Sequence, residues 1–494
     1  DAEPLQTEYS RILAAFSARS LIPDTAQHSL SDRILAAPVN PEDMPSESVP
    51  GSMRRAEHYI MFLRRTVEYM RVKMQAQTVM QESGRLFSHQ LANSLQVDLK
   101  VLRFYSERLK SLLFTLEIAD VAEFTPLQLL ADFVTLLGTY GTTRSFAVIF
   151  EPYDERLPSI PDPVLQLACL DSSLAMKPVF ARFQSVVLTS GTISPLDMYA
   201  KMLGFQPVVS RSLTMSLSRK CICPMIVSRG SDQQPVSSKY ELRSEKGVVR
   251  NYGALLIELA AVVPDGIVVF FTSYIYMEST IQSWSETGIL NRVSEYKLLF
   301  VETPDSIESS LALDNYRRAC DQGRGAVFLC VARGKVAEGI DFDQHYGRCV
   351  LIIGVPFQYT ESRVLRARLE YMREENQIRE TDYLSFDAMR QTAQCIGRVI
   401  RSKADYGIMV LADKRYVRAD KKNKLPPWIL SLLEDRLVDL DTEMAVTTAK
   451  QFLKELAQPL SKRAQIGTAL LTEQDVARLA RGELADASAF PPLA

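Results

Sequence analysis

Five short apolar runs recur along this chain, and each leads into a loop that contains glycine or polar side chains. Stretches with helical character separate the runs, an alternation that is typical of strands joined by crossover helices. The sequence therefore predicts an α/β fold centred on a doubly wound, mostly parallel sheet. The predicted strands are Val186–Leu188, Ile267–Phe271, Ala326–Ala332, Val350–Gly354 and Ile408–Leu411.

The third run leads into Arg333–Phe342, a loop in which two glycines alternate with charged residues. Ligands of such sheets bind outside the carboxyl ends of the strands, and Gly334 and Gly339 permit a close approach that a Cβ would obstruct. The acidic side chains of Glu338 and Asp341 can orient arginines or a ribose. The basic side chains of Arg333 and Lys335 can meet a phosphate chain. We expect an anionic ligand at this loop.

A row of arginines within and just before residues 391–403 marks a second candidate for anion binding. If this stretch is a helix, four polar residues recur at steps of four, four and three and share one face, while apolar residues share another. The polar residues are Arg390, Gln394, Arg398 and Arg401. A solvated charged face is the alternative interpretation. The fixed donor fork of arginine suits phosphate oxygens, however, and the neighbouring loops favour such a ligand.

Hydroxyl groups crowd the loops after the first two runs. They belong to Thr189, Ser190, Thr192 and Ser194 after the first run, and to Ser273 and Tyr274 after the second. Hydroxyls at the start of a helix often cap its amide groups, and this interpretation is favoured for Thr192 and Ser194. For Ser273, which precedes an aromatic residue, contact with a ligand is favoured instead.

Four of these segments, in this order, resemble motifs III, IV, V and VI of superfamily-two helicases, and they are most similar to the XPD family of iron–sulfur helicases. The segments are Thr189–Thr192, Phe270–Tyr274, Arg333–Phe342 and Gln394–Arg401. Two further segments also resemble this family, Leu365–Met372 and Ala412–Arg415. The similarity is strong over residues 146–430 and weaker in Arg54–Met70 and the tail. Other iron–sulfur helicases, which act on repair or telomeric DNA, share the last two motifs and stay an alternative.

The resemblance implies that the chain corresponds to the later part of an XPD helicase. The sequence contains neither a Gly-x-x-x-x-Gly-Lys-Ser/Thr loop nor an Asp-Glu-Ala-His segment, and its first 168 residues contain no cysteine that could hold the family's 4Fe–4S cluster. We expect a partial Arch-like helical domain over residues 1–145, a RecA-like second motor domain over 146–437 and a helical, partner-docking tail over 438–494. The chain alone should not hydrolyse ATP.

The resemblance also implies roles for individual residues in a complete ATP-dependent helicase that uses Mg²⁺ and unwinds DNA in the 5′ to 3′ direction. Arg398 and Arg401 would reach the nucleotide phosphates as arginine fingers, and Gln394 would position the attacking water. Nucleotide contacts would come from Gly334, Glu338, Gly339 and Asp341. Single-stranded DNA would be held by Thr189, Ser190, Ser273, Tyr274, Arg333 and Lys335. The tyrosine ring would also be able to stack on a base.

Members of this family act in the nucleus, in nucleotide excision repair and transcription initiation, as a subunit of TFIIH. The resemblance implies three protein partners: the N-terminal motor half, a von Willebrand A-like TFIIH subunit at the tail, and the assembly factor of the CDK-activating kinase at the Arch. The helix predicted over Thr442–Ala457 offers Phe452 and Lys454 for docking, unless it packs on its own domain. A structural scaffold is therefore the alternative to a motor.

The first 145 residues have helical character. Residues 52–83 contain no glycine or proline, and their apolar residues at 60, 63, 67, 70 and 74 step by three and four, which predicts one long amphipathic helix. Further helices are predicted over Val101–Leu116 and Pro126–Leu137. The strand Phe146–Phe150 should then mark the entry to the motor domain.

Composition limits the remaining function classes. The net charge is −2, from 57 basic and 59 acidic residues, but Arg390–Lys424 holds ten basic and three acidic residues and can attract phosphates. The seven cysteines are scattered, which is typical of a protein in a reducing compartment without a disulfide framework. We expect no metal site either, even at the closely spaced Cys221 and Cys223. No apolar stretch approaches the length of a membrane span, so we expect no membrane association.

Overall fold

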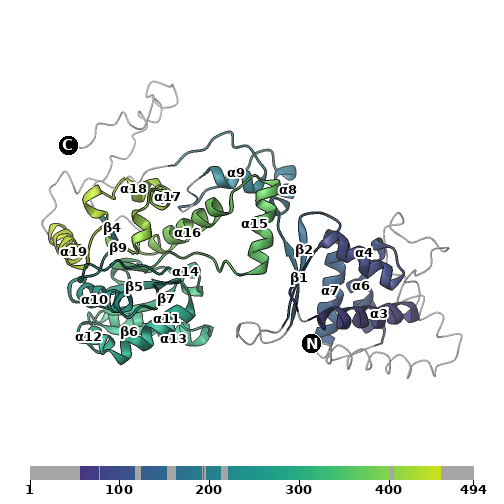
Figure 1. Ribbon diagram of the computed structural model, residues 1–494, viewed down its shortest axis with the longest axis horizontal. Coiled ribbons are helices and arrows are strands. Elements are labelled where there is room, and N and C mark those ends of the chain that lie inside the picture. The colour runs from purple at the N-terminus through teal and green to yellow at the C-terminus, as the bar shows by residue number, and fades with distance from the viewer. Residues whose placement is uncertain are drawn as a thin grey trace. The chain divides into compact units, whose positions relative to one another are not determined.

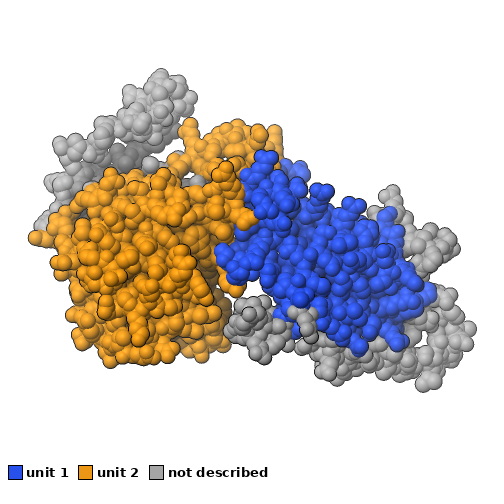
Figure 2. Space-filling model, viewed as in Figure 1, with its two compact units in different colours: residues 1–182, 360–378 blue, residues 183–359, 379–494 orange. Residues whose placement is uncertain are grey.

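The computed structural model describes residues 56–76, 78–116, 124–152, 163–191, 193, 196–212, 221–400 and 405–457, with the side chains of Glu57 and Glu338 excepted. The chain forms two compact units (Figure 2). Unit 1 takes residues up to 182 together with 360–378, and unit 2 takes 183–359 together with the residues from 379 onward. The chain therefore leaves unit 2 once, contributes a helix to unit 1, and returns.

Unit 1 combines helices with a small antiparallel sheet (Figure 1). Its helices are α3 (Ala56–Met74), α4 (Gly84–Leu95), α5 (Leu99–Leu102), α6 (Tyr105–Thr115), α7 (Thr125–Tyr140), α8 (Ser173–Arg182) and α15 (Arg363–Glu375). Its strands, in sheet order, are β1 (Met80–Ser83), β2 (Phe146–Glu151) and β3 (Val164–Cys169). Buried tyrosines tie the helices together, since the Tyr59 hydroxyl donates to the Tyr105 carbonyl at 3.1 Å.

The single long helix predicted over residues 52–83 is wrong in its second half. Helix α3 ends at Met74, and β1 follows and pairs with residues 147–150 of β2. From Ala56 onward the first half is confirmed, because its apolar residues are buried. These are Ile60, Leu63, Val67 and Met70. Residues 52–55 lie outside the described residues. The helix predicted over 101–116 is interrupted between α5 and α6, whereas α7 confirms the one over 126–137.

The strand Phe146–Phe150 is confirmed, but it does not open the parallel-sheet unit. As β2 it pairs antiparallel with β1 and with β3, and Ala367 of α15 joins the same apolar cluster as Ala147 and Ile149. Unit 1 therefore continues to Arg182, beyond the boundary expected between residues 145 and 146. A short apolar run indicates a buried strand, but it does not reveal whether the partner strands are parallel or antiparallel.

Unit 2 is built on a six-stranded sheet in which every pair of neighbours is parallel. In sheet order the strands are β4 (Ile222–Val227), β9 (Gly407–Ala412), β8 (Cys349–Ile353), β5 (Gly266–Phe271), β7 (Ala326–Val331) and β6 (Leu298–Val301). Four of the five predicted strands are confirmed as β5, β7, β8 and β9. The fifth, Val186–Leu188, is wrong, because these residues lie outside both sheets and Val187 is 85% exposed.

Helices cover both faces of this sheet, which confirms the doubly wound α/β architecture (Figure 1). One face is covered by α10 (Lys246–Val262), α11 (Tyr274–Glu286), α12 (Ile289–Tyr296) and α19 (Thr442–Leu456). The other face is covered by α13 (Ser306–Asp321), α14 (Lys335–Gly339), α16 (Glu380–Ile396) and α18 (Pro427–Leu430). Shorter helical segments are α9 (Asp197–Leu203), α17 (Ala419–Lys422), η3 (Gln344–Tyr346), η4 (Lys414–Val417) and η5 (Asp435–Leu437). Among the described residues, no helix is long and apolar enough to cross a membrane.

The start of the expected tail belongs to the body of unit 2. The Leu440 amide donates to the Ile226 carbonyl of β4 at 2.9 Å, and Ala445 and Ala449 of α19 enter the core. The separation expected at residue 438 is therefore not visible over 438–457, and residues 458–494 lie outside the described residues.

The strand order reverses between β5 and β8. After β5 the chain builds β6 and β7 on one side, and then β8 and β9 on the other. Ligands of open parallel sheets bind at the carboxyl ends of the strands beside such a reversal. The segments that emerge at this edge are Thr272–Tyr274 after β5, Ala332–Gly334 after β7 and Gly354–Pro356 after β8.

Candidate functional site

The loops after β5 and β7 meet at one buried carboxylate, that of Glu302. Only 1% of this residue is exposed. The Tyr274 hydroxyl donates to its Oε1 at 3.0 Å, the Val331 amide donates to its Oε2 at 2.8 Å, and the Val336 amide adds a bond to Oε1 at 3.1 Å. The structure thus brings Tyr274 close to the segment that carries Arg333 and its neighbours.

Ser273 and Tyr274 are both fixed at the start of α11. The Ser273 hydroxyl accepts the Tyr276 amide at 3.2 Å, so this residue is an N-cap, the interpretation that the sequence disfavoured. The proton of a capping hydroxyl can still be donated to a phosphate. Burial, followed by Glu302, raises the pKa of Tyr274 to about 12, so its hydroxyl is protonated at neutral pH.

Arg333 belongs to a network that links its loop to α16. One of its guanidinium nitrogens lies 2.6 Å from Asp387 Oδ2 and 2.8 Å from the Pro356 carbonyl oxygen, and Arg390 donates to Asp387 Oδ1 at 2.9 Å. The Asp387 side chain is 4% exposed. Burial alone would lower the pKa of Arg390, but the hydrogen bond and charge of Asp387 outweigh it and raise that pKa. Two arginines therefore share one buried carboxylate.

The other residues predicted to bind a nucleic acid are more exposed to solvent. Lys335 is exposed, and its ammonium group donates to the Pro304 carbonyl at 3.0 Å. Thr189 and Ser190 are also exposed, in the segment that the sequence expected to follow a strand. Among the described residues, Thr189 forms no hydrogen bond with the loops after β5 or β7, so the structure does not gather it with them.

Arg398 lies beyond the end of α16 and not on its predicted face. The helix ends at Ile396, after which Val399 enters the core and the Phe342 amide donates to the Arg398 carbonyl at 2.9 Å. The helix predicted over residues 391–403 is therefore wrong over 397–400, and residues 401–403 lie outside the described residues. The Arg398 side chain is 12% exposed, and its Nη1 lies 3.3 Å from Asp341 Oδ1. Arg398 and Asp341 are thus placed together, at the loop after β7.

The structure describes only some of the remaining residues that were predicted to contact a nucleotide. Gln394 is half-buried in the last turn of α16 and forms no side-chain hydrogen bond with the described part of the chain. At Gly339 a Cβ would meet no atom within 4 Å, whereas at Gly334 it would lie 2.6 Å from Glu302 Oε1. The close Glu302 carboxylate therefore favours glycine at position 334, where the sequence suggested a ligand as the reason. Arg401 and the Glu338 side chain lie outside the described residues.

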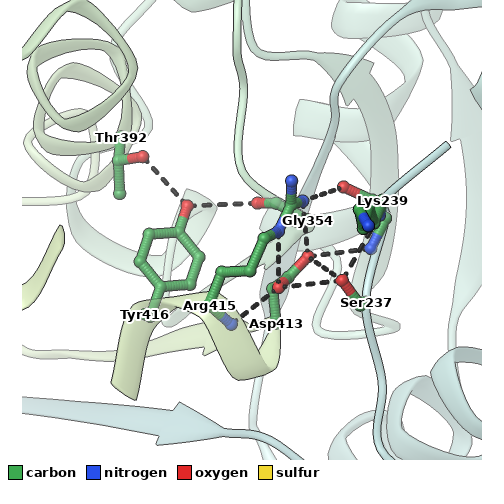
Figure 3. A network of polar contacts seen from close by, with 8 residues as sticks. Ser237, Lys239, Gly354, Thr392, Asp413, Arg415 and Tyr416 are labelled. Carbon is green, nitrogen blue, oxygen red and sulfur yellow. Dashed lines mark hydrogen bonds and ion pairs between the residues drawn. The ribbon is translucent and has the colours of Figure 1, made fainter. Parts of the chain in front are cut away.

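A buried polar network at the end of β9 was not predicted as part of the site (Figure 3). Asp413 accepts the Ser238 amide at 2.8 Å and the Arg415 side chain through Nε at 2.9 Å and Nη2 at 2.7 Å. The Tyr416 hydroxyl donates to the Gly354 carbonyl at 3.1 Å and lies 2.9 Å from the Thr392 hydroxyl of α16. The only sequence signal was the resemblance of Ala412–Arg415 to the family. The network joins the ends of β8 and β9 to α16.

The basic stretch Arg390–Lys424 is largely paired with acids, which weakens the expectation of a phosphate-attracting patch. The ion pairs are Arg390–Asp387, Arg398–Asp341, Arg415–Asp413, Arg418–Asp420, Lys421–Asp420 and Lys424–Asp382. Three of these acids, Asp341, Asp382 and Asp387, lie outside the stretch whose charge was counted. Spacing along the chain cannot reveal acids that the fold supplies.

Helix α19 is confirmed, but Phe452 does not face outward. It is 8% exposed and belongs to the core that α19 forms with the sheet, whereas Lys454 is exposed. A partner that docks on this helix would meet Met444, Lys450 and Lys454 instead. The apolar anchor expected for docking is therefore part of the chain's own core.

Replacing Phe452 with alanine should lower the free energy of unfolding of unit 2 by about 3 kcal/mol, because a large core side chain is deleted. Lys454→Glu should change it by less than about 0.5 kcal/mol, because the site is exposed. Urea denaturation followed by tryptophan fluorescence measures both, since Trp284 and Trp428 are the two tryptophans of the chain and both lie in unit 2. A stable Phe452→Ala variant that loses a partner would restore the docking role.

The cysteines do not fit an iron–sulfur cluster. All seven lie in the described part of the chain, where no two form a disulfide and no group of three or more His, Cys, Asp or Glu side chains could hold a metal ion. Burial raises the pKa of Cys320 to about 11 and that of Cys349 to about 12, and it raises those of Cys330 and Cys395 as well. Thiols that resist ionisation are poor cluster ligands.

Two family models match this chain. The model described as "Helicase C-terminal domain" matches residues 256–431, and "Helical and beta-bridge domain" matches residues 1–143. The General transcription and DNA repair factor IIH helicase subunit XPD of Arabidopsis thaliana is 55% identical over 98% of this chain and 63% of its own length. This chain belongs to the XPD helicase family. In Saccharomyces cerevisiae, subunit XPD/RAD3 is 49% identical over 96% of this chain and 60% of its own length.

The similarity is weaker outside the XPD helicases. The Regulator of telomere elongation helicase 1 homolog of Aedes aegypti is 32% identical over 54% of this chain and 27% of its own length. The chain spans 60–63% of the length of the XPD relatives that it matches. Solved structures described as an XPD helicase and as apo XPD align with TM-scores of 0.45 and 0.46 at 17% and 18% identity, over 78% of this chain and over 64% and 72% of theirs. Those alignments are too distant to transfer residue roles.

Proposed function

We propose that this chain is the second motor half of an ATP-dependent DNA helicase of the XPD type, with unit 2 as the RecA-like motor and unit 1 as the Arch-like helical domain. The placement of Arg398 beside Asp341, where the end of α16 meets the loop after β7, carries the proposal. An arginine held beside this loop can reach the phosphates of a nucleotide that another domain holds.

In this proposal the nucleotide lies between two motor domains, and this chain forms one wall of the cleft. Arg398 and Arg401 neutralise the charge that develops on the transferred phosphoryl group, and Gln394 positions the attacking water. Gly339, Glu338 and Asp341 contact the nucleotide. Asp341 already holds the Arg398 guanidinium, so binding of phosphate would exchange one anionic partner of the arginine for another.

The nucleic acid would lie across the loops after β5 and β7. Ser273, Arg333 and Lys335 donate to the phosphates, and Tyr274 offers its ring to a base. By analogy with the family, Thr189 and Ser190 would contact the strand elsewhere on unit 2. The grouping of the loops after β5 and β7 around Glu302 supports this assignment, because it brings Tyr274 close to the segment that carries Arg333 and Lys335. Opening and closing of the nucleotide cleft then moves the strand, in the 5′ to 3′ direction by analogy with the family.

Several parts of the complete reaction would come from outside this chain. ATP and Mg²⁺ would be bound mainly through the Walker loop and acidic motif of the N-terminal half, because this sequence has neither. The described cysteines do not fit the family's 4Fe–4S cluster, so the cluster takes no step in this mechanism. As part of TFIIH the protein would act in the nucleus, in excision repair and transcription initiation, with a von Willebrand A-like subunit at α19 and the following tail.

The proposal is tested by ATP hydrolysis in the presence of single-stranded DNA. The chain is assayed alone and after mixing with a separately produced half that carries the Walker loop of an XPD relative. We expect no hydrolysis by the chain alone and DNA-stimulated hydrolysis by the mixture. A complex of the two halves that hydrolyses no more ATP than the Walker-loop half by itself would contradict a motor function.

A scaffold is the second candidate function, and exposed apolar side chains on unit 1 favour it. Phe114 of α6 is 86% exposed and Leu129 of α7 is 66% exposed. Such side chains can anchor a partner, here the assembly factor of the CDK-activating kinase. A scaffold should keep this partner after Arg398→Ala and lose it after Phe114→Ser and Leu129→Ser, which co-purification of the complex would reveal.

A further inference from the structure

Glu302 occupies a position from which one side chain can reach two loops. It directly follows β6, and its amide donates to the Leu329 carbonyl of β7 at 2.8 Å, which continues the pairing of these strands. Its side chain therefore emerges at the carboxyl edge of the sheet. The loop after β7 lies there, and so does the start of α11 after β5.

The Glu302 carboxylate is buried without a cation. Its three donors are one hydroxyl and two amides, and among the described residues it forms no ion pair. The nearby Lys335 ammonium donates to Pro304 instead. A buried charge is costly even when it is hydrogen-bonded. An uncharged side chain of similar size would fill the same space. The carboxylate therefore has a role beyond packing.

The loop after β7 closes directly onto this carboxylate. A Cβ at Gly334 would lie 2.6 Å from Oε1 and 2.7 Å from Oε2 of Glu302, too close for any residue but glycine without a shift. Gly334 lies between Arg333 and Lys335. Its close approach to Glu302 therefore fixes the backbone position of both basic residues. On the other loop, the hydroxyl of Tyr274 is held by the same oxygen that accepts the Val336 amide.

We propose that Glu302 is a positioning residue that holds the loops after β5 and β7 as one preorganised surface for the phosphates of single-stranded nucleic acid. This inference rests on the proposed function, in which both loops contact the strand. The change in binding affinity that it predicts has the opposite sign to the change expected from charge alone. Removing a negative charge near a phosphate path should strengthen binding, whereas loosening the two loops should weaken it.

The test is binding of a fluorescein-labelled oligothymidylate to the full 494-residue chain, measured by anisotropy over a range of KCl concentrations. Glu302→Gln should weaken binding about tenfold and should lower the slope of log K against log salt by about 0.7 for each phosphate that the protein no longer neutralises. The matched control is Glu308→Gln, which removes the same charge from an exposed site on α13. The control should bind as tightly as the unchanged chain, or slightly more tightly.

Two further variants keep the test decisive if Glu302→Gln fails to fold. Tyr274→Phe removes one donor and Gly334→Ala displaces the loop, and both leave the carboxylate in place. Each should lower the salt slope in the same direction. Failure of the unchanged chain to bind the oligonucleotide would overturn the proposed DNA path itself. Binding by the unchanged chain, with affinity and slope retained in the variants even where thermal stability falls, would overturn only the role of Glu302.

Discussion

Replacing Arg398 with alanine is expected to lower DNA-stimulated ATP hydrolysis by the two mixed halves about 10³-fold or more, the loss typical of an arginine finger. The backbone of Arg398 is fixed by the Phe342 amide, and the side chain is 12% exposed beside Asp341. The variant therefore removes a guanidinium whose position is already defined. Because the arginine acts on charge that develops in the transition state, the loss should fall on kcat more than on the KM for ATP.

Two control variants separate this role from a loss of structure or of general charge. Arg398→Lys keeps the charge but not the planar fork, and it should recover only a small part of the rate. Arg418→Ala removes an arginine that is 68% exposed and paired with Asp420, and it should leave the rate nearly unchanged. If Arg398→Ala hydrolysed ATP at close to the original rate while both halves stayed associated, Arg398 would not be a finger and the scaffold would be the better function.

The sheet of unit 2 could be predicted because its central strands are buried on both faces. A strand such as β5, with all six residues buried, leaves a continuous apolar run in the sequence. The same signal failed at Val186–Leu188, since three apolar residues predict a strand only if the fold supplies a neighbour. It also failed to place β2, whose antiparallel partners come from residues 80–83 and 164–169. Pairing is a property of distant segments, and local pattern does not contain it.

The candidate site could be predicted in its location but only partly in its contacts. Gly334 and Arg333 were placed correctly at the carboxyl edge of the sheet, but the reason for the glycine is Glu302, a residue with no motif around it. Asp387 was also missed, although it joins Arg333 to Arg390. Buried carboxylates that organise arginines and amides carry no periodic signal. They become visible only when strands from different parts of the chain lie side by side.

Asp413→Ala is expected to lower the free energy of unfolding of unit 2 by about 3–5 kcal/mol, the usual cost of removing one partner of a buried ion pair. Asp413 is fully buried, and its loss strands the Arg415 guanidinium, whose side chain is only 18% exposed. The Ser238 amide would lose its acceptor as well. Adding Arg415→Met should recover part of the stability, because the unpaired charge is then removed, but not all of it, because the amide stays unsatisfied.

Urea denaturation followed by tryptophan fluorescence tests this expectation within unit 2. Asp420→Ala is the matched control, because it deletes an exposed carboxylate from the same segment, paired with Arg418 and Lys421, and should cost less than about 1 kcal/mol. A cost for Asp413→Ala no larger than that of the control would mean that the network in Figure 3 does not hold β8, β9 and α16 together. The contacts of Tyr416 with Thr392 and Gly354 would then be too weak to fasten α16 to the end of β8.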